Sequence, residues 1–282
     1  MPRLLASAAV AGHFGELLQG RLGPGGPVAL VTLPAPGLVL RARLLQGGPI
    51  AVHAPGGRPL LPAQAALLAQ SLGAPPRGRL ILAADMPPGG GAGAATAALL
   101  ATAAVLAAAA GRPLPGPAAL AALCRALEGA TDPLMYPDPG RLLWAPRHAR
   151  ILGHLPALPG LEVVGGWLGP GRRTDPADDR FADVADLVAA WAPAAARGDL
   201  PTLGALATES ARRNAGLRGG PDPAPLIAAA GRLGALGIVA AHTGSARGLL
   251  FAPGGAPVAE AAAALRALGV RGILRLAPPG CR

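Results

Sequence analysis

Short apolar runs, bounded by Gly, Pro and polar residues, follow one another through the first half of the chain and predict β-strands. The expected strands cover residues 4–10, 28–33, 37–44, 50–53, 80–84, 142–145 and 148–152. The segment 15–26, GELLQGRLGPGG, separates the first two runs and is expected to be a loop. The sequence therefore predicts short strands joined by turns in this half.

Apolar residues spaced by three or four positions predict helices elsewhere. Residues 62–72 place Ala65, Leu68 and Leu72 on one face, and Gly73 follows as a stop signal. Pro117 suits the first position of a helix over 116–128. Further helices are expected at 181–197, 200–213, 224–236 and 256–268, and further strands at 161–168, 238–241, 248–252 and 272–276.

The order of these elements favours an α+β fold. Strands and helices alternate without the regular strand–helix–strand repetition of a parallel sheet, so two α+β layers are expected. Pro and Gly at residues 156–160 flank a change of pattern and indicate a domain boundary. A chain of 282 residues is long enough for two domains, here 1–155 and 156–282.

The apolar residues are mostly small. Hydrophobic residues make up 51% of the chain but aromatic residues only 2%, so the core must rely on Ala, Leu and Val, with closely spaced helices and sheet. The net charge of +10 comes from Arg without any Lys. Because these Arg residues are scattered and lack aromatic residues for base stacking, no nucleic-acid partner is expected.

The cysteines, the N-terminus and one long apolar segment indicate a cytoplasmic protein without a membrane partner. Cys124 and Cys281 are far apart and lack metal-ligand spacing, which suits a reducing compartment, although a disulfide between them stays open. The N-terminal MPRLLASAAVAG imitates a signal peptide only faintly, because its apolar run is short and merges with a motif that cleavage would destroy. Residues 94–110 are apolar but rich in Ala, so a buried helix is expected rather than a membrane span.

Residues 86–111, MPPGGGAGAATAALLATAAVLAAAAG, join a turn rich in Pro and Gly to an apolar helix without a charged residue. The first amides of a helix have no partner within it, and the helix dipole is positive there, so this end stabilises an anion. Glycines also let the main chain approach a phosphate closely. The segment matches neither the P-loop nor the dinucleotide-binding fingerprint. Taken alone, it is also explained by ordinary loop chemistry.

Three segments together resemble the motifs of the GHMP kinase superfamily, ATP-dependent kinases of small molecules. The first is Phe14-Gly15-Glu16, the second runs from Pro87 to Ala97 and is similar to the Pro-x-x-x-Gly-Leu-Gly-Ser-Ser-Ala-Ala phosphate loop, and the third is His242-Thr243-Gly244-Ser245. Their order and spacing cover most of the chain. The resemblance implies an α+β, two-domain GHMP-kinase-like fold, with a ribosomal-S5-like N-terminal domain and a ferredoxin-like C-terminal domain.

Within this superfamily the sequence is most similar to the L-threonine kinases of cobalamin biosynthesis. The grounds are Gly-Glu-Leu-Leu-Gln-Gly at residues 15–20, the Thr131-Asp132 pair followed by Tyr-Pro, Thr96 after the phosphate loop, and Ala-His-Thr-Gly-Ser at 241–245. This likeness implies phosphoryl transfer from ATP, with Mg²⁺, to the hydroxyl of an amino-acid substrate, L-threonine. Other acceptors, such as homoserine or mevalonate, stay open.

The same resemblance implies roles for individual residues. Asp132 would act as general base or orient the attacking hydroxyl. The ATP phosphates would lie on Pro88, Gly89, Gly90, Gly91, Ala92, Gly93, Ala94, Ala95 and Thr96. Glu16 and Thr96 would bind Mg²⁺, with the substrate ammonium as the alternative ligand of Glu16. Substrate would contact Glu16, His242, Thr243, Gly244 and Ser245.

The sequence departs from the family pattern at the phosphate loop. Ala94 and Ala95 stand where the superfamily has two Ser, and Thr96 comes one position later. One residue turns a helical side chain by about 100°, so Thr96 is no automatic substitute. A nucleotide- or metabolite-binding protein that has lost catalysis is therefore the alternative class. His13 and Phe14 also stand where the threonine kinases have small residues.

Several candidates have an ordinary structural explanation as well. Asp132 precedes a proline in a turn, where Asp is common for local hydrogen-bonding reasons. Glu16 could be a solvated loop residue, His242 a packed and hydrogen-bonded histidine, and Glu128 an exposed residue at a helix end. The acidic cluster Asp175, Asp178 and Asp179 could hold a metal, but a solvated loop is favoured.

Overall fold

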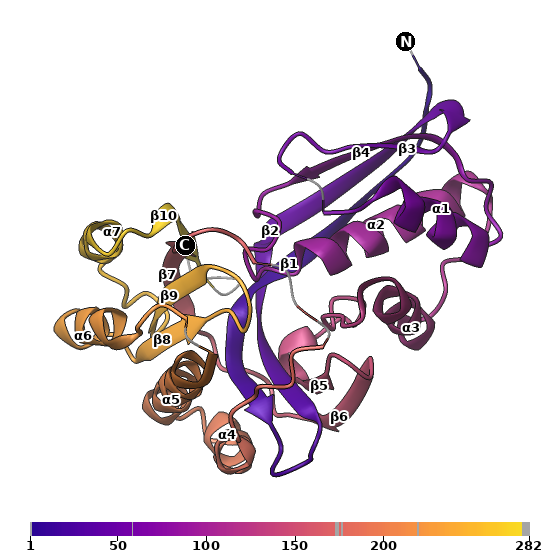
Figure 1. The fold of residues 1–282 in the computed structure, drawn as a ribbon. Helices are drawn as coiled ribbons and strands as arrows, with labels where there is room; N and C mark the ends of the chain where they lie inside the picture. The colour runs from indigo at the N-terminus through magenta and orange to yellow at the C-terminus, as the bar shows by residue number, and fades with distance from the viewer. Residues whose placement is uncertain (1, 58, 173–174, 176, 219, 278–282) are drawn as a thin grey trace.

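The structure is a computed structural model that describes residues 2–57, 59–172, 175, 177–218 and 220–277. The strands are β1 (Leu4–Arg21), β2 (Val28–Pro49), β3 (Ala51–His53), β4 (Arg77–Ala84), β5 (Leu142–Ala145), β6 (Arg150–His154), β7 (Glu162–Trp167), β8 (Gly237–Ala240), β9 (Ala246–Phe251) and β10 (Arg271–Leu276). The helices are α1 (Pro62–Ser71), α2 (Ala94–Ala109), α3 (Pro117–Glu128), the short 3-10 helix η1 (Pro139–Arg141), α4 (Ala185–Ala196), α5 (Leu200–Arg218), α6 (Ala224–Arg232) and α7 (Val258–Ala267). Figure 1 shows α1, α2 and α3 around the N-terminal strands and α4 to α7 around the C-terminal ones.

The strands form one sheet that continues through both halves of the molecule. Their order is β10-β7-β9-β8-β1-β2-β4-β3, and β5 and β6 are attached through β2. The two halves meet where Glu16 of β1 pairs with Ala240 of β8. The fold is therefore mixed α+β with two domains, as expected, although the division at residues 155 and 156 stays a prediction.

Strands β1 and β2 form a long antiparallel hairpin through the middle of the molecule (Figure 1). The loop expected at residues 15–26 is wrong, because the chain remains in β1 up to Arg21 and only residues 22–27 turn. The strands expected at 28–33 and 37–44 are one continuous strand, β2. Pairing with neighbouring strands outweighs the local turn signals, and register shifts near Gly12, His13 and Glu16 absorb the irregularities.

Helix α2 packs on β1 and β2 as the central helix of the N-terminal half. Its side chains are buried on nearly every side, which its small Ala residues allow because they let the helix approach the sheet closely. The expectation of a buried helix is thus confirmed. In the described part of the chain, no helix is both long enough and apolar enough to cross a membrane.

Strands β7 to β10 form an antiparallel sheet of ferredoxin-like type. The order β10-β7-β9-β8, with α4 to α6 in the first crossover and α7 in the second, is that of a βαββαβ unit. The helix expected at 181–197 begins only at Ala185, because the Asp183 carboxylate accepts hydrogen bonds from the amides of Ala185 (2.9 Å) and Gly23 (3.1 Å). The helix expected at 200–213 continues to Arg218, and the helix expected at 224–236 ends at Arg232.

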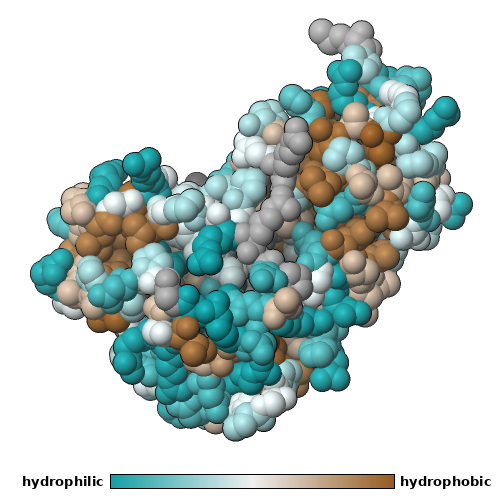
Figure 2. Space-filling view, viewed as in Figure 1, coloured by the Kyte–Doolittle hydropathy of each residue, from teal (hydrophilic) through white to brown (hydrophobic). Residues whose placement is uncertain are grey.

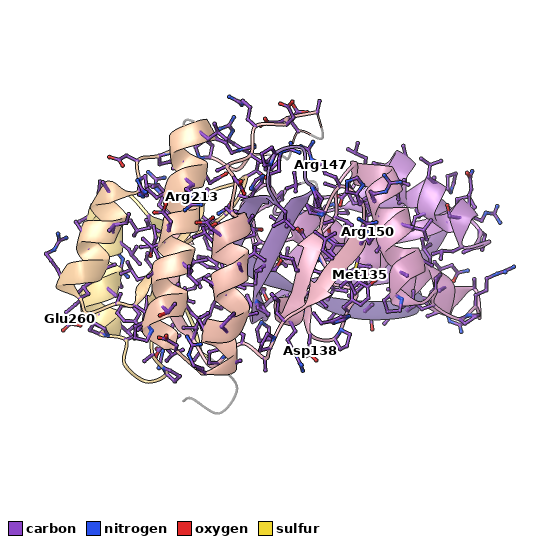
Figure 3. All side chains as sticks on the ribbon, turned by 90° about the horizontal axis from the view of Figure 1, so that it is seen from below. Met135, Asp138, Arg147, Arg150, Arg213 and Glu260 are labelled. Carbon is purple, nitrogen blue, oxygen red and sulfur yellow. The ribbon has the colours of Figure 1, made fainter. Side chains whose placement is uncertain are left out.

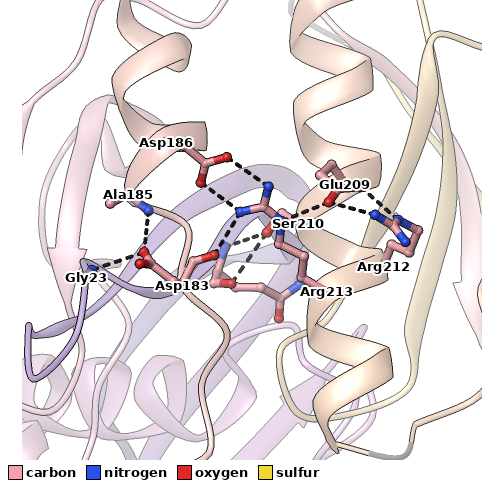
Figure 4. Close-up of polar contacts among 9 residues, drawn as sticks. Gly23, Asp183, Ala185, Asp186, Glu209, Ser210, Arg212 and Arg213 are labelled. Carbon is pink, nitrogen blue, oxygen red and sulfur yellow. Dashed lines mark hydrogen bonds and ion pairs between the residues drawn. The ribbon is translucent and has the colours of Figure 1, made fainter.

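An ion-pair network fixes helices α4 and α5 side by side (Figure 4). Arg213 of α5 donates to both carboxylate oxygens of Asp186 on α4, at 2.7 and 2.8 Å, and to Glu209 one turn earlier on α5, at 2.8 Å. Ser210 accepts a 2.9 Å hydrogen bond from the amide of Gln19, which attaches α5 to β1. The helices of the C-terminal half are thereby held against the central hairpin.

The apolar core extends across both halves. One cluster of buried residues joins Phe14 and Leu17 of β1 to Trp191 of α4 and Leu203 of α5. On the surface, Figure 2 shows apolar side chains gathered over the region of α1, where Leu61 and Leu67 are exposed. The lower part of the same face is mainly hydrophilic.

Candidate active site

The glycine-rich loop before α2 adopts a conformation that its glycines make possible. Gly89, Gly91 and Gly93 all have left-handed backbone angles, with φ of 72°, 78° and 72°. Gly93 is the N-cap of α2 and has no side chain to cover the first amides of the helix. The positive end of α2 is therefore left to an external anion.

The third motif holds this loop from the C-terminal half. The amides of Ser245 and Ala246 donate to the carbonyl of Gly90, at 3.0 and 2.8 Å. Gly244 lies so close to the loop that a Cβ there would be 2.5 Å from the amide nitrogen of Gly91. Gly90, Gly244 and Ser245 thus fix the shape of the loop, and Ser245 is only 3% exposed.

The first motif holds the loop from the other side. The amides of His13 and Gly15 donate to the carbonyls of Ala92 (3.2 Å) and Gly91 (3.1 Å). These bonds attach the loop to the interior strand β1. The three motifs therefore meet around one loop although they are far apart in sequence.

A cavity of about 300 Å³ opens beside the start of α2. Most of the candidates from the sequence line it: Glu16, Pro88, Gly89, Gly91, Ala92, Gly93, Ala94, Ala95, Thr96, Asp132, His242 and Thr243. Gly90, Gly244 and Ser245 do not line it, since they support the loop from behind. Arg147 also lines this cavity and lies in Figure 3 between the two halves of the molecule.

Oxygen atoms converge at the first turn of α2. The Thr96 hydroxyl lies 3.4 Å from carboxylate oxygens of both Asp132 and Glu128, and 3.3 Å from the hydroxyl of Thr131. The amide of Asp132 donates back to Thr96 at 3.2 Å, and Trp144 of β5 donates to the Thr131 carbonyl at 2.6 Å. Thr96 therefore turns its hydroxyl toward the two acids, and Glu128 is half-buried, so the expectation that it is exposed is wrong.

His13 lies between two acidic side chains. Its Nε2 is 3.4 Å from Asp132 and its Nδ1 is 3.8 Å from Glu16. Burial opposes a charge on His13, but Asp132 and, more weakly, Glu16 outweigh it and raise the pKa of His13 from 6.5 to about 9. His13 is therefore a cation at neutral pH. The sequence gives His13 only as a departure from the family pattern, although a histidine directly before the first motif is a detectable signal.

Glu16 is buried in β1, which corrects the expectation of a solvated loop residue. One carboxylate oxygen accepts the amide hydrogen bond of His242 at 2.7 Å. Burial raises the pKa of Glu16 from 4.5 to about 7, and the charge on His13 only partly opposes this. At neutral pH the carboxyl group is thus partly protonated, and its ligand atom lies within 4.8 Å of ligand atoms of His13 and Asp132.

His242 is packed, as its ordinary structural explanation required. Its ring stacks on Phe181 with centroids 4.7 Å apart, and its carbonyl accepts a hydrogen bond from Asn214 at 3.3 Å. Burial, with Arg218 and Arg147 nearby, lowers the pKa of His242 from 6.5 to about 3. The imidazole is therefore neutral and does not act as a cation in the site.

The remaining polar candidates do not join the cavity. Asp178 pairs with Arg218 at 2.7 Å and with Arg180 at 3.2 Å, so this member of the acidic cluster is engaged with arginines, whereas the Asp175 carboxylate accepts a hydrogen bond from the amide of Ala177. Cys124 is buried with a free thiol. Cys281, the other cysteine of the disulfide that the sequence leaves open, lies outside the described residues.

The chain has the two-domain α+β fold of the GHMP small-molecule kinases. It resembles the L. major mevalonate kinase solved with R-mevalonate, with a TM-score of 0.67, 14% identity and 99% of each chain covered. It also resembles a homoserine kinase from Cytophaga hutchinsonii (TM-score 0.61, 14% identity, 96% of this chain and 93% of that one) and a mevalonate pyrophosphate decarboxylase from Streptococcus pyogenes (TM-score 0.64, 10% identity, 98% and 96%). No protein-family model and no curated protein sequence matches the chain. At these identities the likeness establishes the fold alone, which also serves a decarboxylase.

Proposed function

We propose that this protein is an ATP-dependent kinase of a small hydroxyl compound. The observation that carries the proposal is that the uncapped N-terminus of α2 and the Asp132 carboxylate face the same cavity. The first supports binding of a triphosphate and the second supports contact with the group that receives the phosphoryl. Phosphoryl transfer depends on such positioning and on charge neutralisation more than on covalent chemistry by the protein.

In this mechanism the main-chain amides of Gly91, Gly93 and Ala94 hold the ATP phosphates. The acceptor hydroxyl donates a hydrogen bond to Asp132, its oxygen attacks the γ-phosphorus, and the bond to the bridging oxygen of ADP breaks. The hydroxyl proton passes to the Asp132 carboxylate. Protonated His13, whose Nε2 is 3.4 Å from the Asp132 carboxylate, adds positive charge beside the transferred group.

The residues at the start of α2 fit Mg²⁺, which prefers oxygen ligands. Thr96 and Glu128 bring a hydroxyl and a carboxylate together beside Asp132 and would hold the ion. The favoured set therefore keeps Thr96 from the sequence prediction but replaces Glu16 with Glu128, because Glu16 is partly protonated and bonded to the amide of His242. When bound, Mg²⁺ would neutralise charge on the phosphates.

Within this function L-threonine is the favoured acceptor. The support is the likeness of residues 15–20 and 131–132 to the threonine kinases, together with a cavity sized for small ligands. Homoserine and mevalonate are the competing acceptors. An ADP-release assay with ATP and each of the three compounds separates them.

The decisive variant is Asp132→Asn. We expect at least an ~100-fold loss of kcat, the usual contribution of a positioned proton acceptor, with ATP affinity near that of the wild type. Asp138→Asn is the matched control, since Asp138 is exposed and Figure 3 shows it well away from Arg147. Unchanged turnover in Asp132→Asn would remove Asp132 from the mechanism.

The Ala94-Ala95 pair motivates the alternative of a binding protein without catalysis. ATP binding without turnover of any acceptor would support this alternative. Ala95→Ser tests the missing hydroxyl directly, and a higher rate or tighter Mg²⁺ binding is expected if that hydroxyl matters. No change would support Thr96, whose hydroxyl already faces the acids, as its replacement.

A further inference from the structure

A second cavity, of about 420 Å³, adjoins the first. Arg172, His242 and Thr243 line both cavities, so the two spaces share a wall. The second cavity extends into the C-terminal half, toward α5 and the beginning of β9. A molecule bound at Asp132 can therefore extend past His242 into this space.

The arginines around the second cavity differ in whether a carboxylate pairs with them. Arg180 and Arg218 both pair with Asp178, at 3.2 and 2.7 Å. Arg247 also lines the cavity, but it forms no ion pair in the part of the chain that the structure describes. Its guanidinium donates only to carbonyl oxygens, those of Ala246 at 2.7 Å and Gly244 at 3.4 Å.

Arg247 is a half-buried cation, and no carboxylate among the residues that the structure describes pairs with it. Burial lowers its pKa below the ordinary value of a guanidinium, and the carboxyl group of Glu16 is the one charge that opposes this. Glu16 is itself partly protonated at neutral pH, so it is a weak counter-charge. A guanidinium removed from water is costly unless an anion pairs with it.

The local geometry suits a ligand for Arg247. The two carbonyl contacts are made by the same nitrogen, Nη1, and they fix the guanidinium at the cavity wall. A planar guanidinium held in this way can form paired hydrogen bonds with a carboxylate or a phosphate. Asn214, on the same wall, is anchored by its hydrogen bond to the His242 carbonyl.

We propose that the second cavity is a subsite for an anionic group of the acceptor molecule, a carboxylate or a phosphate, and that Arg247 is the residue that binds it. This inference rests on the proposed kinase function for its account of the acceptor. The acceptor hydroxyl lies at Asp132, and the anionic end of the same molecule passes Thr243 and reaches Arg247. Specificity for an anionic alcohol over a neutral one follows.

The first test measures anion binding without any turnover. Thermal unfolding is followed at constant ionic strength, with ADP present to occupy the phosphate loop, while sodium acetate or inorganic phosphate is added. We expect one of the two anions to stabilise the wild type, and Arg247→Gln to lose that stabilisation. Stabilisation by acetate would indicate a carboxylate as the ligand, and stabilisation by phosphate would indicate a phosphate.

Arg180→Gln is the matched control, because Arg180 lies on the same cavity but is exposed and paired with Asp178. It should keep the response of the wild type. If Arg247→Gln fails to fold, Arg247→Lys takes its place as the test variant. It retains the charge, so it should fold and keep part of the wild-type response. No stabilisation of the wild type by either anion, or an equal response in Arg247→Gln, overturns the proposal.

The second test compares L-threonine with L-threoninol, in which an alcohol replaces the carboxylate. Calorimetric titration of the wild type should show at least ~10-fold tighter binding of L-threonine, the usual difference made by a charge-assisted hydrogen bond. Equal binding of the two compounds contradicts the subsite. ADP that fails to bind contradicts the kinase function instead, while the response of Arg247 to anions remains measurable.

Discussion

The buried group of His13, Glu16 and Asp132 predicts an unusual dependence of stability on pH. The pKa of Glu16 is raised from 4.5 to about 7, and that of His13 from 6.5 to about 9. In both cases the folded state binds a proton that the unfolded state has released. These two groups therefore make the free energy of unfolding fall as pH rises, whereas His242, whose pKa burial lowers to about 3, makes it rise up to about pH 6.5.

The two shifts act in successive pH windows. Glu16 lowers stability between about pH 4.5 and 7, and His13 lowers it between about 6.5 and 9. At about 1.4 kcal/mol per pKa unit, each window removes about 3 kcal/mol. Such a loss is a large part of the free energy of unfolding of an ordinary domain, which is roughly 5–15 kcal/mol. The stability contributed by protonated His13 is complete below about pH 6.5 and is lost by about pH 9.

Two substitutions separate the windows. Glu16→Gln removes the contribution of Glu16, so His242 should make the stability of this variant rise up to about pH 6.5, and the variant keeps an oxygen acceptor for the amide of His242. It leaves the upper decline, since Asp132 contributes more than Glu16 to the raised pKa of His13. His13→Gln removes the upper decline, and His53→Gln, on the exposed strand β3, is the control with an unchanged profile.

Urea unfolding monitored by the fluorescence of buried Trp144 and Trp191 measures these profiles. The series runs from about pH 5 to about pH 9 at fixed ionic strength, which excludes the acid range where surface carboxylates titrate. A wild-type stability that stays level or rises between about pH 6.5 and 9, above the range in which His242 titrates, would refute the argument. So would a Glu16→Gln stability that does not rise relative to the wild type between about pH 5 and 6.5.

Three further predictions concern the loop, the thiol and the helices. Gly93→Ala should weaken ATP binding at least ~10-fold in a calorimetric titration, because the new Cβ would lie 2.7 Å from a side-chain carbon of β1. Gly111→Ala is the control, because Gly111 also has a left-handed backbone but faces open space, and this variant should only lower the melting temperature slightly. Cys124 should resist a thiol reagent until the protein is unfolded, because burial raises the pKa of its thiol to about 12. Peptide mapping distinguishes labelled Cys124 from labelled Cys281. Arg213→Ala should cost about 1 kcal/mol in urea unfolding after allowance for solvent screening, and equal losses in Arg212→Ala would show that the contact between α4 and α5 is unimportant.

The local parts of the fold and site could be predicted from sequence. The turn before α2, the helix itself and the Asp132 loop depend on glycine, proline and apolar spacing within a few residues. The order of the three motifs also indicated that they meet. These features are encoded close to where they act.

The parts that were missed depend on contacts distant in sequence. Strand β1 continues through its glycines because β2 and β8 pair with it, so Glu16 became buried instead of solvated. Glu128 faces Thr96 only because α3 ends beside α2. The charge on His13 arises from Asp132, more than a hundred positions away, and no local pattern reports it.

Because Glu16 pairs with Ala240, the sheet joins the two halves, and the chain connection at residues 156–160 has only a secondary role. Proteolytic nicking there would cut the peptide chain and leave the shared sheet and the common apolar core intact. Fragments produced separately would each expose an unpaired strand edge and the apolar surface that the other normally covers. Each of the two domains therefore relies on the other to cover part of its apolar surface.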